Sequence, residues 1–302
     1  MSLSTTNSLS ISSERRLVST AHGEIAYRET GSGPAAIFIH GVFLNADLWD
    51  AQLRDLADLR RCIAPDLLAH GQSAVSSELT LAKQAEMIIS FIDAVVGDGQ
   101  AQAGNGDAGA GNGQVDLIGN DTGGAIAQLV AVAIPDRVRS LTLTNCDTDE
   151  NLPPAAFQPI IDLARAGELA GAMPAIAASP ELARASLASS LEHPEAIGDD
   201  VLAGFFAPFT DPARAAAVQA YVAGMNNEVT VAIRGDLARL QTPTLIVWGT
   251  GDEFFGLSWA RWLADTIPGT VRLVTVDGGR LFFPLERPAE LSQPLRELWQ
   301  ES

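Results

Sequence analysis

Hydrophobic and polar positions along the chain follow two alternating patterns. Short apolar runs end in turn residues, and longer stretches with helical spacing separate them. This alternation is typical of a mostly parallel sheet with helices on both faces. The runs at 37–39 and 245–248 are apolar without interruption, as strands buried on both faces are. The chain therefore predicts an α/β fold with a doubly wound sheet.

The pattern gives approximate positions for the individual elements. An N-terminal hairpin is predicted over residues 17–28, turning at His22 and Gly23. Six further strands are predicted at 35–39, 61–64, 115–118, 138–144, 244–248 and 271–276. The clearest helical patterns are at 81–95, 125–133, 258–266 and 288–299. The expected sheet thus has eight strands, and helices flank it.

Three segments depart from this alternation. Residues 1–14 are rich in Ser and Thr and are expected to form a disordered tail, and 97–114 a flexible loop, because neither can bury enough apolar surface to order itself. Residues 151–240 are rich in Ala, have helical spacing and are interrupted by several prolines. We interpret 151–240 as a helical cap inserted into a core made of 15–150 and 241–302.

The net charge of the chain limits the kinds of molecule that it is expected to bind. The 302 residues have a formal net charge of −18, which opposes binding to nucleic acid or to an anionic membrane surface. No apolar run reaches the roughly 18 residues of a membrane span, and the N-terminus lacks the apolar region of a signal peptide. The two cysteines, Cys62 and Cys146, are expected to be buried free thiols. We expect a cytoplasmic protein with a small-molecule substrate, and its oligomeric state stays open.

One motif carries chemistry. In the run Gly119-Asn120-Asp121-Thr122-Gly123, a predicted strand passes through a very tight turn into a predicted helix. The spacing is that of a nucleophile elbow, G-x-Nu-x-G, with Asp121 as its exposed central residue. The glycines let the two backbones approach closely, and the N–H of Thr122 lies at a helix N-terminus, which favours negative charge.

Three further segments support a resemblance to the α/β-hydrolase fold superfamily. Residues 39–41 (Ile-His-Gly) resemble its oxyanion turn, which includes His40 and the N–H of Val42. Residues 65–73 are similar to its P-D-x-x-G-H-G-x-S loop, with Ala69 in place of a glycine. Residues 248–252 resemble the strand end that supplies the acid of the triad, here Asp252. The resemblance implies the α/β-hydrolase fold. An aspartate at the centre of the elbow resembles the arrangement in haloalkane dehalogenases and epoxide hydrolases.

The chain departs from that pattern at the histidine of the triad. When the run from Gly278 to Pro288 is laid over the family's G-x-G-H-F-x-x-x-E-x-P segment, Leu281 occupies the histidine position. A leucine cannot accept a proton from water. Asp252, at the usual acid position, is a candidate for that task with a neighbouring carboxylate. The resemblance also implies an alternative acid just after the strand at 138–144, where Asp147 and Asp149 lie.

Two more residues are candidates for substrate binding. Arg280 could bind a substrate carboxylate or balance the nearby aspartates. The resemblance to epoxide hydrolases, which polarise the epoxide oxygen with two cap tyrosines, implies such a role for Tyr221, the one tyrosine of the predicted cap. The predicted lining of an apolar cavity includes Phe205, Phe206, Phe209 and Met225. We expect no cofactor and no metal.

Three functions are compatible with these residues. In the first, Asp121 attacks a small, mostly apolar substrate of the C-halide, epoxide or ester class, and the N–H groups of Val42 and Thr122 stabilise negative charge. In the second, Asp121 is a general base in a lyase, isomerase or cyclase reaction, which needs no histidine. In the third, the chain binds a small molecule without catalysis.

Overall fold

The computed structural model describes residues 15–76, 78–97 and 113–301. Its centre is one eight-stranded sheet in the order β1-β2-β4-β3-β5-β6-β7-β8, in which β1 and β2 are antiparallel and β3 to β8 run parallel. The strands are β1 (Arg16–Thr20), β2 (Gly23–Thr30), β3 (Ala35–Ile39), β4 (Arg61–Pro65), β5 (Val115–Asp121), β6 (Val138–Cys146), β7 (Thr244–Gly249) and β8 (Thr270–Val276). The predicted α/β-hydrolase fold is confirmed, and each predicted strand lies within three residues of its predicted bounds.

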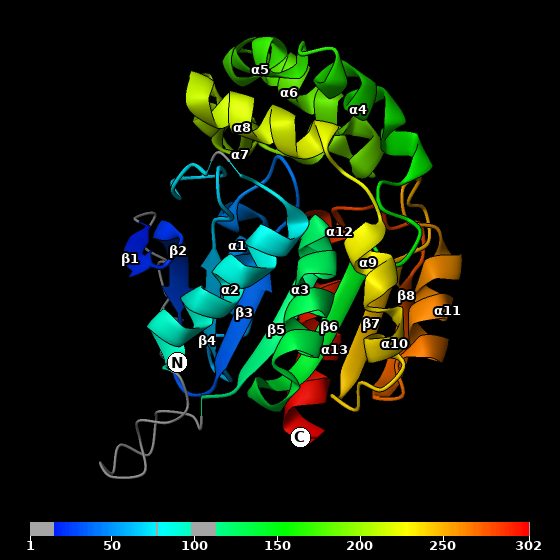
Figure 1. Ribbon diagram of the computed structural model, residues 1–302. Coiled ribbons are helices and arrows are strands. Elements are labelled where there is room, and N and C mark those ends of the chain that lie inside the picture. The colour runs from blue at the N-terminus through cyan, green and yellow to red at the C-terminus, as the bar shows by residue number, and fades with distance from the viewer. Residues whose placement is uncertain (1–14, 77, 98–112, 302) are drawn as a thin grey trace, which may run out of the picture.

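Helices cover both faces of the sheet (Figure 1). Helices α2 and α3 contact one another on one face, and α1 contacts α13 on the other. Strands β3 and β5 lie in the middle of the sheet and are buried along their whole length, and the apolar run at 37–39 predicts this for β3. The helices of the core are α1 (Asp50–Asp55), α2 (Leu81–Val96), α3 (Thr122–Ala133), α9 (Glu228–Ala232), α10 (Arg234–Leu237), α11 (Leu257–Thr266), α12 (Phe283–Glu286) and α13 (Ala289–Glu301).

A layer of five helices lies across the carboxyl end of the parallel strands (Figure 1). We call this the cap layer: α4 (Gln158–Arg165), α5 (Leu169–Ala178), α6 (Pro180–Leu187), α7 (Asp199–Phe206) and α8 (Pro212–Ala223). The predicted cap, 151–240, extends further along the chain than this layer. Its last part forms α9 and α10, and α10 contacts the core helix α3. The short pieces follow from the prolines, which begin α6 and α8 at the first helical position.

The tail predicted at 1–14 and most of the loop predicted at 97–114 lie outside the described residues. Of the described loop positions, Gly97 ends α2 and Gly113 and Gln114 precede β5. None of the helices in the described ranges combines the length and the apolar content that a bilayer crossing requires.

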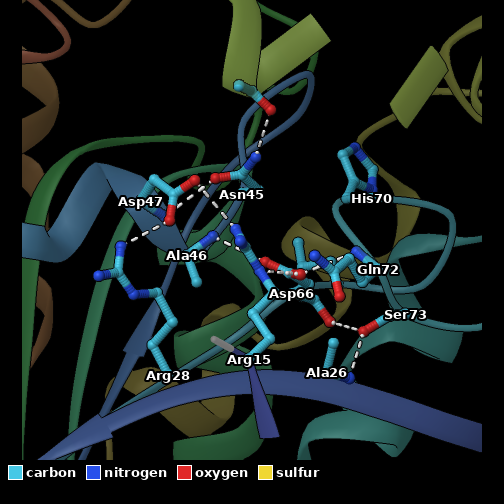
Figure 2. Close-up of polar contacts among 12 residues, drawn as sticks. Arg15, Ala26, Arg28, Asn45, Ala46, Asp47, Asp66, His70, Gln72 and Ser73 are labelled. Carbon is cyan, nitrogen blue, oxygen red and sulfur yellow. Dashed lines mark hydrogen bonds and ion pairs between the residues drawn. The ribbon is translucent and has the colours of Figure 1, made fainter. Parts of the chain in front are cut away.

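A buried carboxylate holds the loop that follows β4 (Figure 2). Asp66 accepts hydrogen bonds from the N–H groups of Ala46 and Gln72 and pairs with Arg15 at 2.7 Å. The Ser73 hydroxyl donates to the Asp66 carbonyl oxygen at 2.6 Å. This loop is the P-D-x-x-A-H-G-x-S segment, and its acid and serine therefore serve to fix the loop against the neighbouring strands.

Asp66→Ala should destabilise the protein by roughly 3 kcal/mol, because the loop loses its acceptor and Arg15 loses a buried partner. Asp58→Ala is the control. Its exposed pair with Arg296 should contribute less than about 1 kcal/mol. Urea unfolding of both variants measures the difference, and equal losses would contradict the structural role given to Asp66.

Candidate active site

Asp121 occupies the sharp turn between β5 and α3. Its backbone has φ 56° and ψ −137°, a strained conformation for a residue other than glycine. The turn is possible because of close backbone contacts. A Cβ at Gly119 would overlap the carbonyl group of Gly123, and a Cβ at Gly123 would overlap the Ile39 carbonyl on β3. The glycines of the motif therefore let β3, β5 and α3 meet at one point, with Asp121 at the tip.

The Asp121 carboxylate receives donors from the turn after β3. The N–H of Val42 donates to Asp121 Oδ2 at 3.0 Å and lies 2.9 Å from the Thr122 hydroxyl oxygen. Gly41 brings this turn close, since a Cβ there would overlap the Asp121 side chain. The two N–H groups predicted to stabilise negative charge, those of Val42 and Thr122, both lower the pKa of Asp121. One carboxylate oxygen is therefore anchored in the position of an oxyanion.

His40 holds the turn after β3 in place through two hydrogen bonds. Its Nε2 accepts a hydrogen bond from the N–H of Leu67 at 3.0 Å, so Nδ1 carries the proton and donates to the Gly41 carbonyl at 2.7 Å. Burial lowers the pKa of His40 to about 4, which keeps the ring neutral. His40 thus orients the turn that carries the Val42 N–H, and it is not among the residues that line the cavity described next.

An apolar cavity of about 410 Å³ lies between the cap layer and the carboxyl ends of the strands. Phe206 and Met225 line it, as predicted, whereas Phe205 and Phe209 are buried outside it. Within the described lining, the charged side chains are two carboxylates, Asp121 and Asp147. The apolar lining includes Phe43, Phe157, Ile160, Leu163, Met173, Ile176, Phe206, Phe254, Leu281 and Phe282. The cavity suits a small apolar molecule that reacts with a carboxylate.

Burial is the largest influence on the pKa values of Asp121 and Asp147. It raises the pKa of Asp121 to about 7 despite the N–H donors, and the nearby Asp252 raises it further. It raises the pKa of Asp147 well above its usual range, to which the charges of Asp121 and Asp252 also contribute. Two carboxyl groups that share an apolar cavity do not both ionise readily. The N–H groups of Val42 and Thr122 favour the ionised form of Asp121, whereas no hydrogen bond lowers the pKa of Asp147, so the pair favours an ionised Asp121 beside a protonated Asp147.

Asp252 lies at the end of β7, and hydrogen-bond donors occupy both of its carboxylate oxygens. Its Oδ2 accepts from the Asn145 side-chain amide at 2.7 Å, and its Oδ1 accepts from the N–H of Phe254 at 2.8 Å. Burial raises the pKa of Asp252 to about 6. Both carboxylate oxygens are thus engaged by donors, and Asp252 is not among the cavity-lining residues.

The structure divides the predicted site residues into two groups. It brings Val42, Asp121, Thr122 and Asp147 together around the cavity. His40, Asp252, Tyr221 and Arg280 lie outside the lining. Arg280 pairs with Glu253 at 3.4 Å and donates to cap carbonyl groups of Ala188 and Ser189.

Two candidate residues outside the lining, Tyr221 and Asp149, contact other parts of the structure. Tyr221 lines a neighbouring cavity of about 290 Å³, which shares Met225 with the main one. Asp149, the further candidate acid, pairs with Arg234 at 2.7 Å. Arg280 and Asp149 therefore form ion pairs and are not among the cavity-lining residues.

Two asparagines that the sequence reasoning missed hold the site together. The Asn120 amide donates to the Leu281 carbonyl at 3.0 Å, which fixes Leu281 beside the elbow. Asn145, with φ 28°, accepts from the N–H of Gly249 at 2.7 Å and links β6 to β7. Asn120 is the variable residue of the elbow motif, and Asn145 contacts residues more than 100 positions away, so neither had a local signal.

The sheet order, the elbow and the helical layer over it together define an α/β-hydrolase fold. The sequence profile of the alpha/beta hydrolase family matches residues 36–293, and the chain belongs to this family. Its structure is similar to that of an alpha/beta hydrolase fold protein from Burkholderia ambifaria, with a TM-score of 0.76 and 22% identity over 94% of this chain and 97% of that one. A meta-cleavage product hydrolase from Pseudomonas fluorescens has a TM-score of 0.74 and 17% identity over 96% and 98% of the two chains. At these identities the likeness concerns the fold.

Curated relatives match a shorter stretch. An uncharacterised protein of Mycobacterium tuberculosis is 32% identical over 131 residues, 42% of this chain and 33% of that protein. Haloalkane dehalogenase 2 of the same organism is 31% identical over 138 residues, 44% of this chain and 42% of the dehalogenase. The chain thus spans about a third to two fifths of the length of these relatives.

The raised pKa of Asp121 predicts a pH-dependent stability. Such a carboxyl stabilises the fold below its unfolded pKa near 4, and this stability is lost as pH rises through about 7. Asp121→Asn removes the effect. The variant's advantage in free energy of unfolding over wild type should be larger at pH 8 than at pH 5, by on the order of 2 kcal/mol.

Urea titrations at the two pH values measure that difference. Asp265→Asn, at an exposed position of α11, is the control and should change stability by less than about 0.5 kcal/mol at either pH. Parallel pH curves for wild type and Asp121→Asn would show that burial does not shift this carboxyl.

Proposed function

We propose that this chain is a hydrolase in which Asp121 attacks the electrophilic carbon of a small, mostly apolar substrate of the C-halide, epoxide or ester class. One observation carries the proposal: Asp121 projects from a strained elbow into the apolar cavity, with Oδ2 held by the Val42 N–H. The strain and the glycine contacts serve to expose this one side chain. A structural carboxylate would need neither.

The anchored oxygen suggests how the two steps divide. Oδ2 of Asp121 keeps its hydrogen bonds to the N–H donors, and Oδ1 attacks the substrate carbon to give an ester on Asp121. When water then adds to the carbonyl carbon of this ester, the negative charge develops on Oδ2, where the N–H groups of Val42 and Thr122 stabilise it. The preorganised donors are thus used twice, first on the carboxylate and later on the tetrahedral intermediate.

A second function, general-base catalysis by Asp121 in a lyase, isomerase or cyclase reaction, is favoured by the position of Leu281. Leu281 lines the cavity where the resemblance places the histidine, and the described lining includes no histidine. A carboxylate with a pKa of about 7 is also a better base than an ordinary aspartate. The two functions differ in whether a covalent ester forms.

Intact-protein mass after incubation with haloalkanes, epoxides and activated esters should show an adduct on wild type and none on Asp121→Asn. Its rate of formation should rise with pH through about 7, because only the ionised carboxylate is nucleophilic. Peptide mapping should place the ester on Asp121. Wild-type protein that forms no adduct, yet exchanges substrate protons for deuterium in an Asp121-dependent way, would replace the proposal with the general-base function.

Leu281→His should shorten the lifetime of that adduct by about 100-fold or more, because an imidazole beside the elbow can deprotonate water. Leu281→Gln is the control, since it is polar without being a base at neutral pH. Time-resolved mass measurement after removal of excess substrate gives both lifetimes. If histidine and glutamine shorten the lifetime equally, hydration of the cavity limits the second step and the lack of an imidazole does not.

A further inference from the structure

The geometry points to Asp147 as the proton donor of this site, and hence to a substrate whose departing atom is an oxygen rather than a halide. This inference rests on the proposed attack by Asp121. It adds a catalytic residue and chooses among the three substrate classes, with the epoxide as the compact, apolar form of such an electrophile.

The first observation is the position of Asp147. It follows β6 directly, it lines the same cavity as Asp121, and its side chain is buried. Its N–H lies 3.4 Å from the Asp121 carbonyl oxygen, so the two residues belong to adjacent strand ends. Asp147 therefore lies beside the space where a substrate would meet Asp121.

The second observation is that Asp147 is held by its backbone while one of its carboxyl oxygens, Oδ1, is left without a partner. The Gln128 amide on α3 donates to the Asp147 carbonyl oxygen at 2.9 Å, and the Thr148 hydroxyl donates to Gln128 at 2.7 Å. Asp147 Oδ1, in contrast, is fully buried and has no hydrogen-bond partner in the described structure. A buried polar atom without a partner is costly, and such atoms are concentrated at functional sites.

The third observation is the charge of the cavity. Asp149, the next acid along the chain, is neutralised by Arg234, but the cavity lining that the structure describes includes no cationic side chain. Asp147 is therefore protonated beside the ionised Asp121, in agreement with its raised pKa. A protonated carboxyl has one O–H to donate.

These observations give a balanced sequence of steps. Asp121 Oδ1 forms a bond to the substrate carbon, the carbon–oxygen bond of the epoxide breaks, and its electron pair stays on the departing oxygen. That oxygen takes the proton of Asp147. The product of this step is a hydroxyalkyl ester on Asp121 and an ionised Asp147, so the cavity still contains one negative charge.

The second step returns the proton. Asp147, now a carboxylate, takes a proton from water, and the hydroxide adds to the Asp121 carbonyl carbon. The tetrahedral intermediate expels the alkoxide, which takes the proton back from Asp147 and leaves as a diol. Asp121 is left protonated and passes its proton to Asp147, which restores the starting state. Asp147 thus performs the proton transfers for which a histidine would otherwise be needed.

A halide would use none of this arrangement. It departs as an anion that takes no proton, and an apolar cavity would have to solvate it. The side-chain hydroxyls of the described lining are those of Thr122, Ser186, Ser189 and Ser190. Two of them already donate elsewhere, since the Thr122 hydroxyl donates to Asp121 Oδ2 at 3.4 Å and the Ser186 hydroxyl donates to the Leu182 carbonyl oxygen.

The test compares two probes that differ in their need for a proton. Styrene oxide opens with proton transfer to oxygen, whereas benzyl bromide releases bromide without one. In Asp147→Asn, the rate of ester formation on Asp121 should fall by about 100-fold or more with styrene oxide. With benzyl bromide it should stay within about threefold of wild type, which also shows that the variant is folded. Asp265→Asn is the matched control for both probes.

The pH profile gives a second readout. Wild type should react with styrene oxide in a bell-shaped profile, rising as Asp121 ionises near pH 7 and falling where Asp147 loses its proton. Asp147→Glu should retain the bell, and benzyl bromide should show the rising limb alone.

The outcomes separate the two proposals. Absence of an Asp121 adduct with both probes in wild type would overturn the proposed function and this inference with it. Adducts with both probes, but an equal effect of Asp147→Asn on each, would overturn the role of Asp147 alone. Selective loss with styrene oxide in Tyr221→Phe but not in Asp147→Asn would likewise overturn it, because the buried Tyr221 hydroxyl, which also has no partner in the described structure, would then be the donor.

Discussion

The site depends on a negative charge placed where water is scarce. Asp121 is buried at the end of β5, and its ionised form persists because the N–H groups of Val42 and Thr122 point at it. Those donors are available because glycines allow three backbone segments to meet at the turn. The same burial prevents a second carboxyl, Asp147, from ionising alongside it. Fold, strain and protonation state therefore follow from one constraint.

The cap layer maintains that constraint by closing the cavity. It is tied to the core through polar contacts as well as apolar packing. The Asn45 amide donates to the Gly204 carbonyl at 2.9 Å, and Arg214 donates to the Ser73 carbonyl at 2.9 Å. Arg280, a candidate for substrate binding, contacts the cap in the same way. These contacts hold the cap layer over the carboxyl groups of Asp121 and Asp147. In such apolar surroundings each remaining hydrogen bond is stronger.

Leu281 and Asp252 together show how the site differs from a relay built on histidine. Asp252 keeps its place at the end of β7, but Asn145 and the Phe254 N–H occupy its oxygens. Leu281 contributes a hydrophobic wall, and its carbonyl is held by Asn120. Asp147, the proton donor that we propose, lies instead at the β6 end of the sheet, and its Oδ1 has no hydrogen-bond partner in the described structure.

The sequence by itself determined the strand and helix positions, the fold class and the place of Asp121, because these follow from local periodicity and from a motif five residues long. It also pointed to Val42 and Thr122, whose N–H groups belong to turns with their own glycines. It could not rank Asp147 above Asp252, exclude Arg280 and Tyr221 from the lining, or find Asn120 and Asn145. Those outcomes depend on contacts between segments 25 to 161 positions apart, such as Asn120 with Leu281, which only the packed structure brings together.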